Sequence, residues 1–343
     1  MNKQILEEDI KQFSEKFGLA EQLRGKSFLV TGATGLIGSI LVKCLLELNK
    51  QKGLDVKIIA VVRNLQKAMQ LFGKDTTDLH IVMLELSEIG VNNLMPKVDY
   101  VVHLASPTAS KFFVDNPVET LRTSIEGTTS VLEYAKSAQI KAMVYASSLE
   151  VYGSNLTDEW IKEDFQGYVS PTEVRSSYNM GKRAAECLCH SYAKEYGVNV
   201  MIARMTQTFG AGVEYNDGRV FAQFARKAIE EQDIELHTAG KTCRMYCYTT
   251  DAINAILYLL LKGEKGEAYN IANKDSYISI YDMAQMIKDE FSPGINVVVT
   301  PKDNQGYAPE TKLRLDTTKM ESLGWKPQYD LRTMFKRLIK SLR

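Results

Sequence analysis

The sequence is poor in the features that mark secreted, metal-binding and membrane proteins. Its five cysteines are too few for a disulfide framework, and their spacing does not match a structural zinc site. No run approaches the roughly 20 apolar residues that span a bilayer, and residues 1–25 lack the apolar core of a signal peptide. We therefore expect a cytoplasmic protein with no bound metal and no membrane partner.

The chain also has no excess charge of either sign. It carries 42 lysines and arginines against 42 aspartates and glutamates. Because a basic field over the whole chain drives non-specific binding to nucleic acid, we expect no nucleic-acid partner. With 45% hydrophobic and 24% charged residues, the 343-residue chain has the composition of a globular protein with one large domain or two.

Short β-branched runs alternate with longer amphipathic runs between residues 24 and 210. Continuous apolar strands separated by helices indicate a parallel sheet that is covered on both faces. The predicted fold class is therefore α/β, with a Rossmann doubly wound parallel sheet in a dinucleotide-binding domain. The expected strands are 27–31, 56–62, 79–84, 100–103, 142–146 and 198–203, and the expected helices are 36–48, 118–138 and 177–196.

Two further regions flank this dinucleotide-binding domain of residues 24–210. Residues 1–23 have an amphipathic pattern that predicts an N-terminal helical extension packed on the domain. Residues 211–343 break the strand–helix alternation, and they predict a smaller C-terminal domain that is mainly substrate-binding. Within that domain, parts of about 246–272 are expected to return to the core.

A glycine-rich loop follows the first predicted strand and opens the first predicted helix. Its glycines are Gly32, Gly35 and Gly38, in the run Thr31-Gly-Ala-Thr-Gly-Leu-Ile-Gly. Residues without a Cβ let backbone amides approach a diphosphate, and a helix N-terminus adds unpaired N–H groups and a positive dipole end. Between a strand and a helix, this motif predicts a dinucleotide site. Its residues are Gly32, Thr34, Gly35, Leu36, Ile37 and Gly38.

The end of the second predicted strand indicates which dinucleotide binds. NAD sites normally place a carboxylate there for the ribose hydroxyls, whereas this strand ends in Ala-Val-Val followed by Arg63 and Asn64. An arginine without a neighbouring acid matches a 2′-phosphate. We therefore expect an NAD(P) cofactor and favour NADP(H) over NAD. The alternative for Arg63 is a solvated arginine at a strand end.

A tyrosine and a lysine share one face of a later predicted helix. Tyr178 and Lys182 are four residues apart. Tyrosine is a poor base because its pKa is near 10, and a neighbouring ammonium lowers that pKa by favouring the phenolate. Ser148, just past the fifth predicted strand, is placed to share the substrate proton. Together with the glycine-rich loop, these residues predict a catalytic group of Tyr178, Lys182 and Ser148.

These motifs together resemble the extended short-chain dehydrogenase/reductases, the NAD-dependent epimerase/dehydratase family of nucleotide-sugar enzymes. The resemblance covers residues 26–343 and includes Val151-Tyr-Gly153 and Leu323-Gly-Trp-Lys-Pro327. It implies a nucleotide-sugar substrate and hydride transfer at sugar C4 through a 4-keto sugar, in which Tyr178 takes the hydroxyl proton. It also implies cofactor contacts from Glu85, Leu86, Leu104, Ala105, Ser106, Tyr178 and Lys182, and substrate contacts from Pro107, Glu150, Gln207 and Val220.

Glu150, two residues after Ser148, indicates one branch of this family. The 4,6-dehydratases of the family carry an Asp-Glu pair, and Leu149 replaces that Asp here. UDP-glucuronate decarboxylases keep only the Glu, and they also resemble this chain at 175–178 and 216–220. The resemblance therefore favours a UDP-glucuronate decarboxylase in which Glu150 acts in catalysis.

Two arginines are candidates to bind the acidic groups of such a substrate. A guanidinium matches both diphosphate and carboxylate bidentately, which makes Arg219 and Arg244 candidate contacts. For each of them, a surface ion pair is the alternative.

Several residues depart from the family pattern and leave other reactions open. Gln207 stands where these enzymes usually carry Asn, Ala211 replaces a usual Pro, and Arg63 fits NADPH better than NAD. The alternatives are an NADPH-dependent reductase of a nucleotide-linked sugar or sugar-alcohol precursor, a nucleotide-sugar 4-epimerase, and a non-catalytic dinucleotide sensor.

The resemblance also bears on partners and pathway. The family commonly dimerises through two helices, which would be 118–138 and 177–196 here, so a homodimer is expected. The expected pathway is the synthesis of cell-surface polysaccharide precursors.

Overall fold

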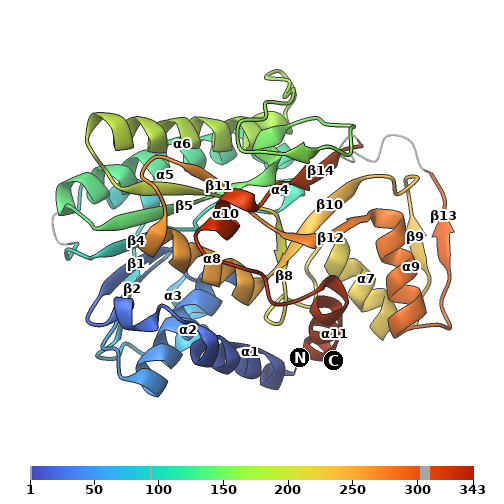
Figure 1. The fold of residues 1–343 in the computed structure, drawn as a ribbon, viewed down its shortest axis with the longest axis horizontal. Coiled ribbons are helices and arrows are strands. Elements are labelled where there is room, and N and C mark those ends of the chain that lie inside the picture. The colour runs from blue at the N-terminus through green and yellow to red at the C-terminus, as the bar shows by residue number, and fades with distance from the viewer. Residues whose placement is uncertain (1, 93–94, 302–309) are drawn as a thin grey trace.

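A seven-stranded sheet lies at the centre of the computed structural model, which describes residues 2–92, 95–301 and 310–343 (Figure 1). Every neighbouring pair of its strands is parallel. The strand order is β11-β7-β5-β4-β1-β2-β3, so the order reverses between β1 and β4. This arrangement confirms the predicted Rossmann doubly wound parallel sheet.

The strands of this sheet lie close to their predicted positions. They are β1 (Ser27–Thr31), β2 (Lys57–Val62), β3 (Leu79–Met83), β4 (Tyr100–His103), β5 (Ala142–Ser148), β7 (Val200–Met205) and β11 (Ala268–Ile271). β5 runs beyond its predicted end, which makes Ser148 the last residue of a strand rather than part of the following loop.

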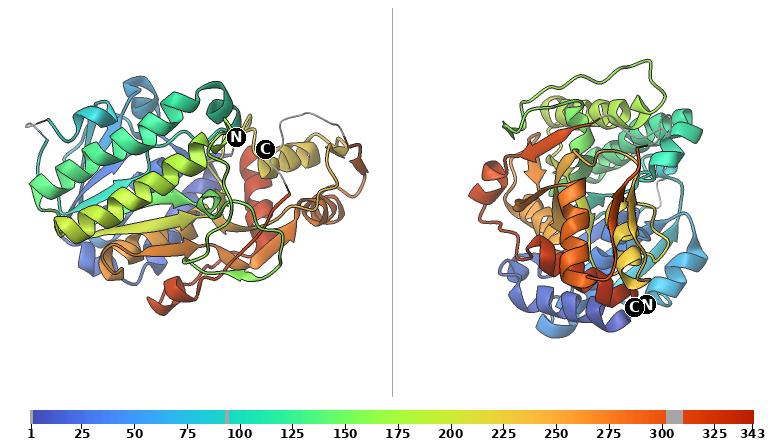
Figure 2. Two further views of the ribbon diagram at one scale, coloured as in Figure 1. Left: turned by 90° about the horizontal axis from the view of Figure 1, so that it is seen from above. Right: turned by 90° about the vertical axis from the view of Figure 1, so that its right-hand side faces the viewer.

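Alternating side chains bury the two faces of the sheet under different helices. Phe28 and Val30 pack on one face with α2 (Leu36–Lys52) and α8 (Thr249–Lys262). Leu29 points to the other face, which is covered by α5 (Pro117–Ala138) and α6 (Ser176–Glu195). These two helices lie side by side along the sheet (Figure 2).

Two short helices of the dinucleotide-binding region were not predicted. α3 (Leu65–Phe72) begins at Asn64, whose side chain accepts a hydrogen bond from the Lys67 amide at 2.9 Å. α4 (Ser110–Asp115) spans six residues. Helices this short show too few turns for a readable apolar period.

A smaller region surrounds a second, five-stranded sheet. Its core stacks the rings of Phe209 and Phe221 at 4.6 Å and adds Phe335. The sheet contains β6 (Trp160–Ile161), β8 (Gln207–Phe209), β10 (Cys243–Tyr248), β12 (Asn273–Ser279) and β14 (Lys312–Leu315), and β9 (Ile234–Leu236) pairs separately with β13 (Val297–Val299). The helices of this region are α7 (Val220–Ile229), α9 (Ile280–Phe291) and α11 (Leu331–Leu342), and α10 (Thr318–Ser322) packs on β11.

The chain passes between the two regions more than once. β11 joins the large sheet, and Trp325 is fully buried in the same core as α8, where its Nε1 donates to the Asp251 carbonyl at 3.0 Å. In the opposite direction, β6 pairs with β14 of the small sheet. The division at residue 210 therefore stays a prediction, because each region takes segments from both sides of it.

The N-terminal residues form α1 (Lys3–Lys16) and a short 3₁₀ turn at Ala20–Leu23. α1 packs across α2, α8 and α11. Its buried Asp9 accepts a hydrogen bond from the Tyr248 hydroxyl at 2.5 Å and from Arg337 Nε at 2.7 Å, so α1 links both regions. Within the described ranges, no helix combines the length and the apolar character needed to cross a membrane.

Candidate active site

The glycine-rich turn has no room for a side chain at two of its positions. Gly32 has a φ of +67°, and a Cβ on it would lie 2.7 Å from the backbone nitrogen of Ala105. A Cβ on Gly38 would lie 2.3 Å from the Gly32 carbonyl oxygen. The Gly35 amide closes the turn by donating to that carbonyl at 3.0 Å. Glycine is therefore required where β1, α2 and the segment after β4 meet.

Helix α2 begins directly after this turn with an open N-terminus. Its N-cap is Gly35, so no side chain caps the first-turn amides. Thr34, Leu36 and Ile37 are half-buried around it. Unpaired amides beside a turn that excludes side chains fit the diphosphate of a dinucleotide.

The carboxyl ends of β1 and β4 form the adjoining wall. Residues 104–106 follow β4 and are half-buried beside the turn. Thr31 Oγ1 lies 2.7 Å from His103 Nδ1 and accepts from the Ala105 amide at 3.3 Å. Burial lowers the pKa of His103 to about 3, so its imidazole is neutral. Ligands of open α/β sheets bind at such a reversal of strand order.

Arg63 lies at the outer rim, directly after β2, and is exposed. Within the described ranges its guanidinium makes no hydrogen bond or ion pair. Of the residues expected near the adenine, Glu85 caps a 3₁₀ turn reciprocally with Glu88. Leu86 packs against α5, because a Cβ on Gly127 would lie 3.1 Å from its Cδ1. Arg63 is therefore available for a ligand, and Glu85 and Leu86 have structural contacts.

Tyr178 and Ser148 meet where α6 crosses the end of β5. The Tyr178 ring is 8% exposed and stacks on Phe113 of α4 with ring centroids 4.2 Å apart. Ser148 lies beside its side chain and acts to lower the pKa of Tyr178, and the Ser148 hydroxyl accepts from the Glu150 amide at 3.2 Å. The phenol and the serine hydroxyl are thus held together, with Phe113 fixing the plane of the ring. Phe113 carried no recognisable motif in the sequence.

Lys182 lies one turn along α6 from Tyr178 and is 3% exposed. Its Nζ donates to the Ala146 carbonyl at 2.7 Å and lies 4.8 Å from the centre of the Tyr145 ring. Burial lowers the pKa of Lys182 to about 8. The ammonium is 5.8 Å from the centre of the Tyr178 ring, so the predicted proximity of the two residues is present.

The pKa of Tyr178 differs from the expectation that Lys182 would lower it. Burial raises this pKa above its ordinary value, and the charge of Glu150 raises it further. Ser148 acts in the opposite direction but does not reverse the shift. The physical reason is desolvation, since the phenolate would lie in a nearly closed, ring-lined space. Tyr178 is therefore a neutral phenol at neutral pH.

Glu150 forms an ion pair at the edge of the site. It lies in η3 (Leu149–Tyr152), the 3₁₀ turn after β5. Arg175, at the N-cap of α6, donates to its carboxylate at 3.0 Å and 3.4 Å. Asn179 Nδ2 donates to the Glu150 carbonyl at 2.9 Å, and its Oδ1 is buried without a partner in the described part of the chain. Arg175 belongs to residues 175–178, which resemble the decarboxylases in sequence, but no pattern in the sequence assigned it a role.

The predicted substrate residues are more dispersed. Arg219 pairs with Asp217 at 2.5 Å and lies over the Phe221 ring, so the ion-pair alternative describes it. Arg244 of β10 donates to Thr311 Oγ1 at 3.3 Å. Gln207 is the first residue of β8 and is half-buried. Its Oε1 has no partner among the described residues. Pro107 is half-buried after β4, and Val220 starts α7.

Across the described residues, no group of three or more His, Cys, Asp and Glu side chains is arranged to hold a metal ion. The doubly wound sheet has the glycine turn at its strand reversal and Ser148, Tyr178 and Lys182 together at the end of β5, which is the arrangement expected of a dinucleotide-dependent enzyme.

Comparison with known proteins identifies the family. The profile of the NAD dependent epimerase/dehydratase family matches residues 28–272. UDP-glucuronic acid decarboxylase 5 of Arabidopsis thaliana is 30% identical over 314 residues, which are 89% of this chain and 85% of that protein. UDP-glucuronic acid decarboxylase 1 of Danio rerio is 30% identical over 88% of this chain and 69% of its own. The chain belongs to the NAD-dependent epimerase/dehydratase family, as the sequence motifs predicted.

Several solved structures have a similar fold. The structure of UDP-glucose 4-epimerase of Thermotoga maritima, solved with UDP-glucose, matches this chain with a TM-score of 0.79 at 22% sequence identity. The match covers 92% of this chain and 98% of that protein. UDP-glucuronic acid 4-epimerase of Bacillus cereus, in complex with NAD, has a TM-score of 0.74, 22% identity and the same coverage. At this identity the likeness shows the fold alone.

We predict that Gly32→Ala lowers the affinity for the dinucleotide by at least about tenfold. The new Cβ would meet the backbone of Ala105, which cannot move aside as a flexible side chain would. Gly53→Ala is the matched control, because Gly53 also has a positive φ but has no atom within 4 Å of the added Cβ. Calorimetric titration with NAD and NADP measures both variants. Equal affinities would contradict the assignment of the turn.

Proposed function

We propose that this protein decarboxylates UDP-glucuronic acid through a C4 ketone. The observation that carries the proposal is the pair of Glu150 and Arg175 beside Tyr178, since a guanidinium takes a carboxylate bidentately. Leu149 is buried and has no proton for a leaving hydroxyl, which separates this site from a 4,6-dehydratase. Decarboxylase relatives at 30% identity over most of the chain support the same reaction.

The chemistry requires a proton acceptor at C4. A bound nicotinamide dinucleotide supplies the hydride acceptor for that carbon. Tyr178, once its phenol has given up its own proton to solvent, takes the C4 hydroxyl proton, and the Ser148 hydroxyl beside it is placed to pass that proton on. The resulting ketone is β to the carboxylate on C5. When that C–C bond breaks, CO₂ leaves, and the electron pair moves onto the C4 oxygen, where both hydroxyl groups stabilise the charge. A proton from solvent then adds at C5 and restores the C4 ketone, which must be reduced again at C4 to give the pentose.

The surroundings of Tyr178 determine when it can act as a base. Burial and Glu150 hold its pKa high in the ligand-free protein. Arg175 acts in the opposite direction on the same ring. Moving Arg175 away from the ring would raise the pKa of Tyr178 further, whereas neutralising the charge of Glu150 would lower it. The Glu150–Arg175 pair therefore links substrate binding to proton transfer at Tyr178.

We expect Arg175→Met to lower kcat/KM for UDP-glucuronic acid by about 100-fold, because a charged contact of this kind is worth about 2–5 kcal/mol. With UDP-glucose, which has the same C4 hydroxyl but no carboxylate, reduction of the cofactor should fall much less, since only the effect of Arg175 on the pKa of Tyr178 is lost. Release of labelled CO₂ and cofactor absorbance are the two measurements.

Arg24→Met is the control for this experiment, since Arg24 is half-exposed and pairs with Glu21 at the surface. Equal losses with both sugars would show that Arg175 is structural. An active wild-type protein that releases no CO₂ from UDP-glucuronic acid would exclude the decarboxylase.

Arg63 supports a proposal about the cofactor and a second candidate reaction. Its exposed guanidinium follows β2 without a partner in the described residues, and no carboxylate ends that strand. We propose that it binds the 2′-phosphate of NADP(H). A cofactor that exchanges at each turnover suits an NADPH-dependent reductase of a nucleotide-linked sugar, which is the second candidate.

We predict that Arg63→Asp reverses the preference, raising affinity for NAD and lowering it for NADP, because the carboxylate accepts ribose hydroxyls and repels a phosphate. Lys50→Asp, a charge change on the exposed side of α2, is the control. Mass spectrometry of the denatured wild-type protein identifies the cofactor that it carries. Tightly held NAD and an unchanged preference in Arg63→Asp would refute both the NADP assignment and the reductase.

We also propose a homodimer that uses the outer face of α5 with its neighbours. Val118 and Ile125 of α5 are 67% and 36% exposed, and Val114 of α4 is 49% exposed beside them. Light scattering should give twice the mass of the 38.6 kDa chain. Val118→Asp should produce a monomer, whereas Leu156→Asp, at a 65% exposed site outside these helices, should not. A wild-type monomer would refute the proposal.

A further inference from the structure

A buried ion pair lies behind the catalytic face of α6. Glu186 and Arg204 are each 10% exposed, and the Arg204 guanidinium donates to the carboxylate through Nη2 at 2.7 Å and through Nε at 3.0 Å and 3.2 Å. Ser147 of β5 donates to the same carboxylate at 2.5 Å. Arg204 comes from β7, where it is in register with Ser147. Arg204 begins the run Arg204–Gly210 that also contains Gln207, and the sequence pattern assigned it no role.

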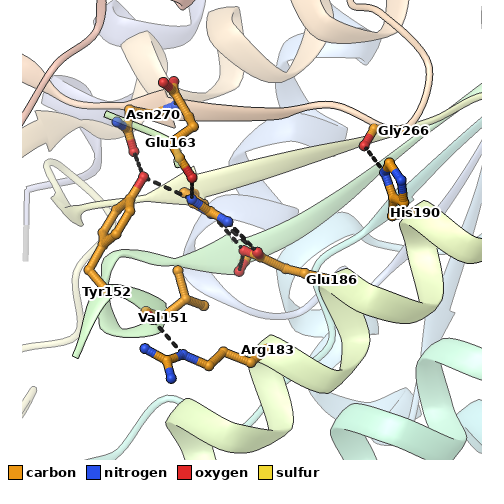
Figure 3. Close-up of polar contacts among 10 residues, drawn as sticks. Val151, Tyr152, Glu163, Arg183, Glu186, His190, Gly266 and Asn270 are labelled. Carbon is orange, nitrogen blue, oxygen red and sulfur yellow. Dashed lines mark hydrogen bonds and ion pairs between the residues drawn. The ribbon is translucent and has the colours of Figure 1, made fainter. Parts of the chain in front are cut away.

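The same guanidinium also holds the turn that carries Glu150. Arg204 Nη1 donates to the Tyr152 hydroxyl at 3.1 Å and to the Glu163 carbonyl at 2.5 Å. Tyr152 is the last residue of η3, and its hydroxyl donates to Asn270 of β11 at 2.5 Å. Figure 3 shows Tyr152 and Glu186 extending toward each other from η3 and α6. One side chain therefore joins both segments that carry the reacting groups.

Three contacts fasten α6 to the end of β5, and each is one helical turn from the next. Tyr178 meets Ser148, Lys182 donates to the Ala146 carbonyl, and Glu186 accepts from Ser147. Residues four apart lie on the same face of a helix. The contact of Glu186 with Ser147 therefore fixes how α6 is rotated about its axis and how far along that axis Tyr178 and Lys182 lie. The Glu186–Arg204 pair is buried and belongs to the last of these three contacts along α6.

The type of side chain at position 204 is informative. Removing two charges from water is unfavourable, and a buried ion pair often adds no stability over a packed apolar pair. A planar guanidinium with five N–H donors in a rigid fork can, however, hold two separate segments in one fixed geometry, whereas a lysine ammonium is a flexible point charge. Arg183 links α6 to η3 a second time, through the Val151 carbonyl at 2.7 Å, and this link does not involve Arg204.

We propose that Arg204 is a positioning residue: by holding Glu186 of α6 and Tyr152 of η3 together, it sets the placement of Tyr178 relative to Glu150. This inference rests on the proposed function only in that both residues act at the sugar.

The test uses the double variant Arg204→Met/Glu186→Gln in the full-length protein. It removes both charges and keeps a side-chain carbonyl oxygen that can accept the Ser147 hydrogen bond. The control is Arg337→Met/Asp9→Asn, the same chemical change at the buried pair that joins α1 to α11. We expect kcat with UDP-glucuronic acid to fall by about 100-fold in the test variant, the effect of a displacement of about 1 Å. KM should change by less than about threefold, because groups that bind the substrate are kept.

Hydrogen exchange gives a second readout that needs no turnover. Residues 149–152 and 176–179 should exchange about tenfold faster in the test variant than in the control. A kcat equal to that of the control, or unchanged exchange in both segments, would overturn the proposal. If the wild-type protein releases no CO₂ from UDP-glucuronic acid, the proposed function fails and exchange alone decides the role of Arg204.

Discussion

The packing of α6 against the carboxyl end of β5 is the contact on which the candidate site depends. It brings the phenol of Tyr178 to the hydroxyl of Ser148 and anchors Lys182 on the Ala146 carbonyl. β5 lies between β4 and β7 in the parallel sheet, so the end of this strand cannot move independently. The reversal of strand order at β1 and β4 then places the glycine turn and its open helix N-terminus at the same edge of the sheet.

Features that arise from local sequence could be predicted. The strand–helix alternation predicted the doubly wound sheet because each strand is short, apolar and bounded by turns. The requirement for glycine at Gly32 and Gly38 was readable, because three glycines at this spacing between a strand and a helix are typical of a dinucleotide-binding turn. The four-residue spacing of Tyr178 and Lys182 needed only the helical period. The catalytic and cofactor-binding roles that these motifs predict are part of the proposed function.

Features that arise from distant contacts could not be predicted. The pKa of Tyr178 is raised because Phe113 and the surrounding chain desolvate it, and these neighbours come from other segments of the sequence. The small sheet pairs β10 with β12 and β14, which follow much later in the chain, and it also takes β6 from before residue 210. Arg204 meets residues of η3, α6 and β11 only in the folded protein, either directly or through Tyr152. Arg219 differs from these cases because its partner Asp217 is only two residues away. A surface ion pair was the alternative that the sequence offered for Arg219.

In the proposed reaction, hydride leaves and returns to C4 of one sugar while CO₂ is lost from C5. The most direct test is to convert UDP-glucuronic acid that carries deuterium at C4 and to locate the deuterium in the product by NMR. We predict a UDP-linked pentose that keeps the deuterium at C4, because a cofactor that stays bound would return the deuteride to the carbon from which it came. Release of the carboxyl carbon with loss of deuterium from C4, or turnover without release of CO₂, would contradict this reaction.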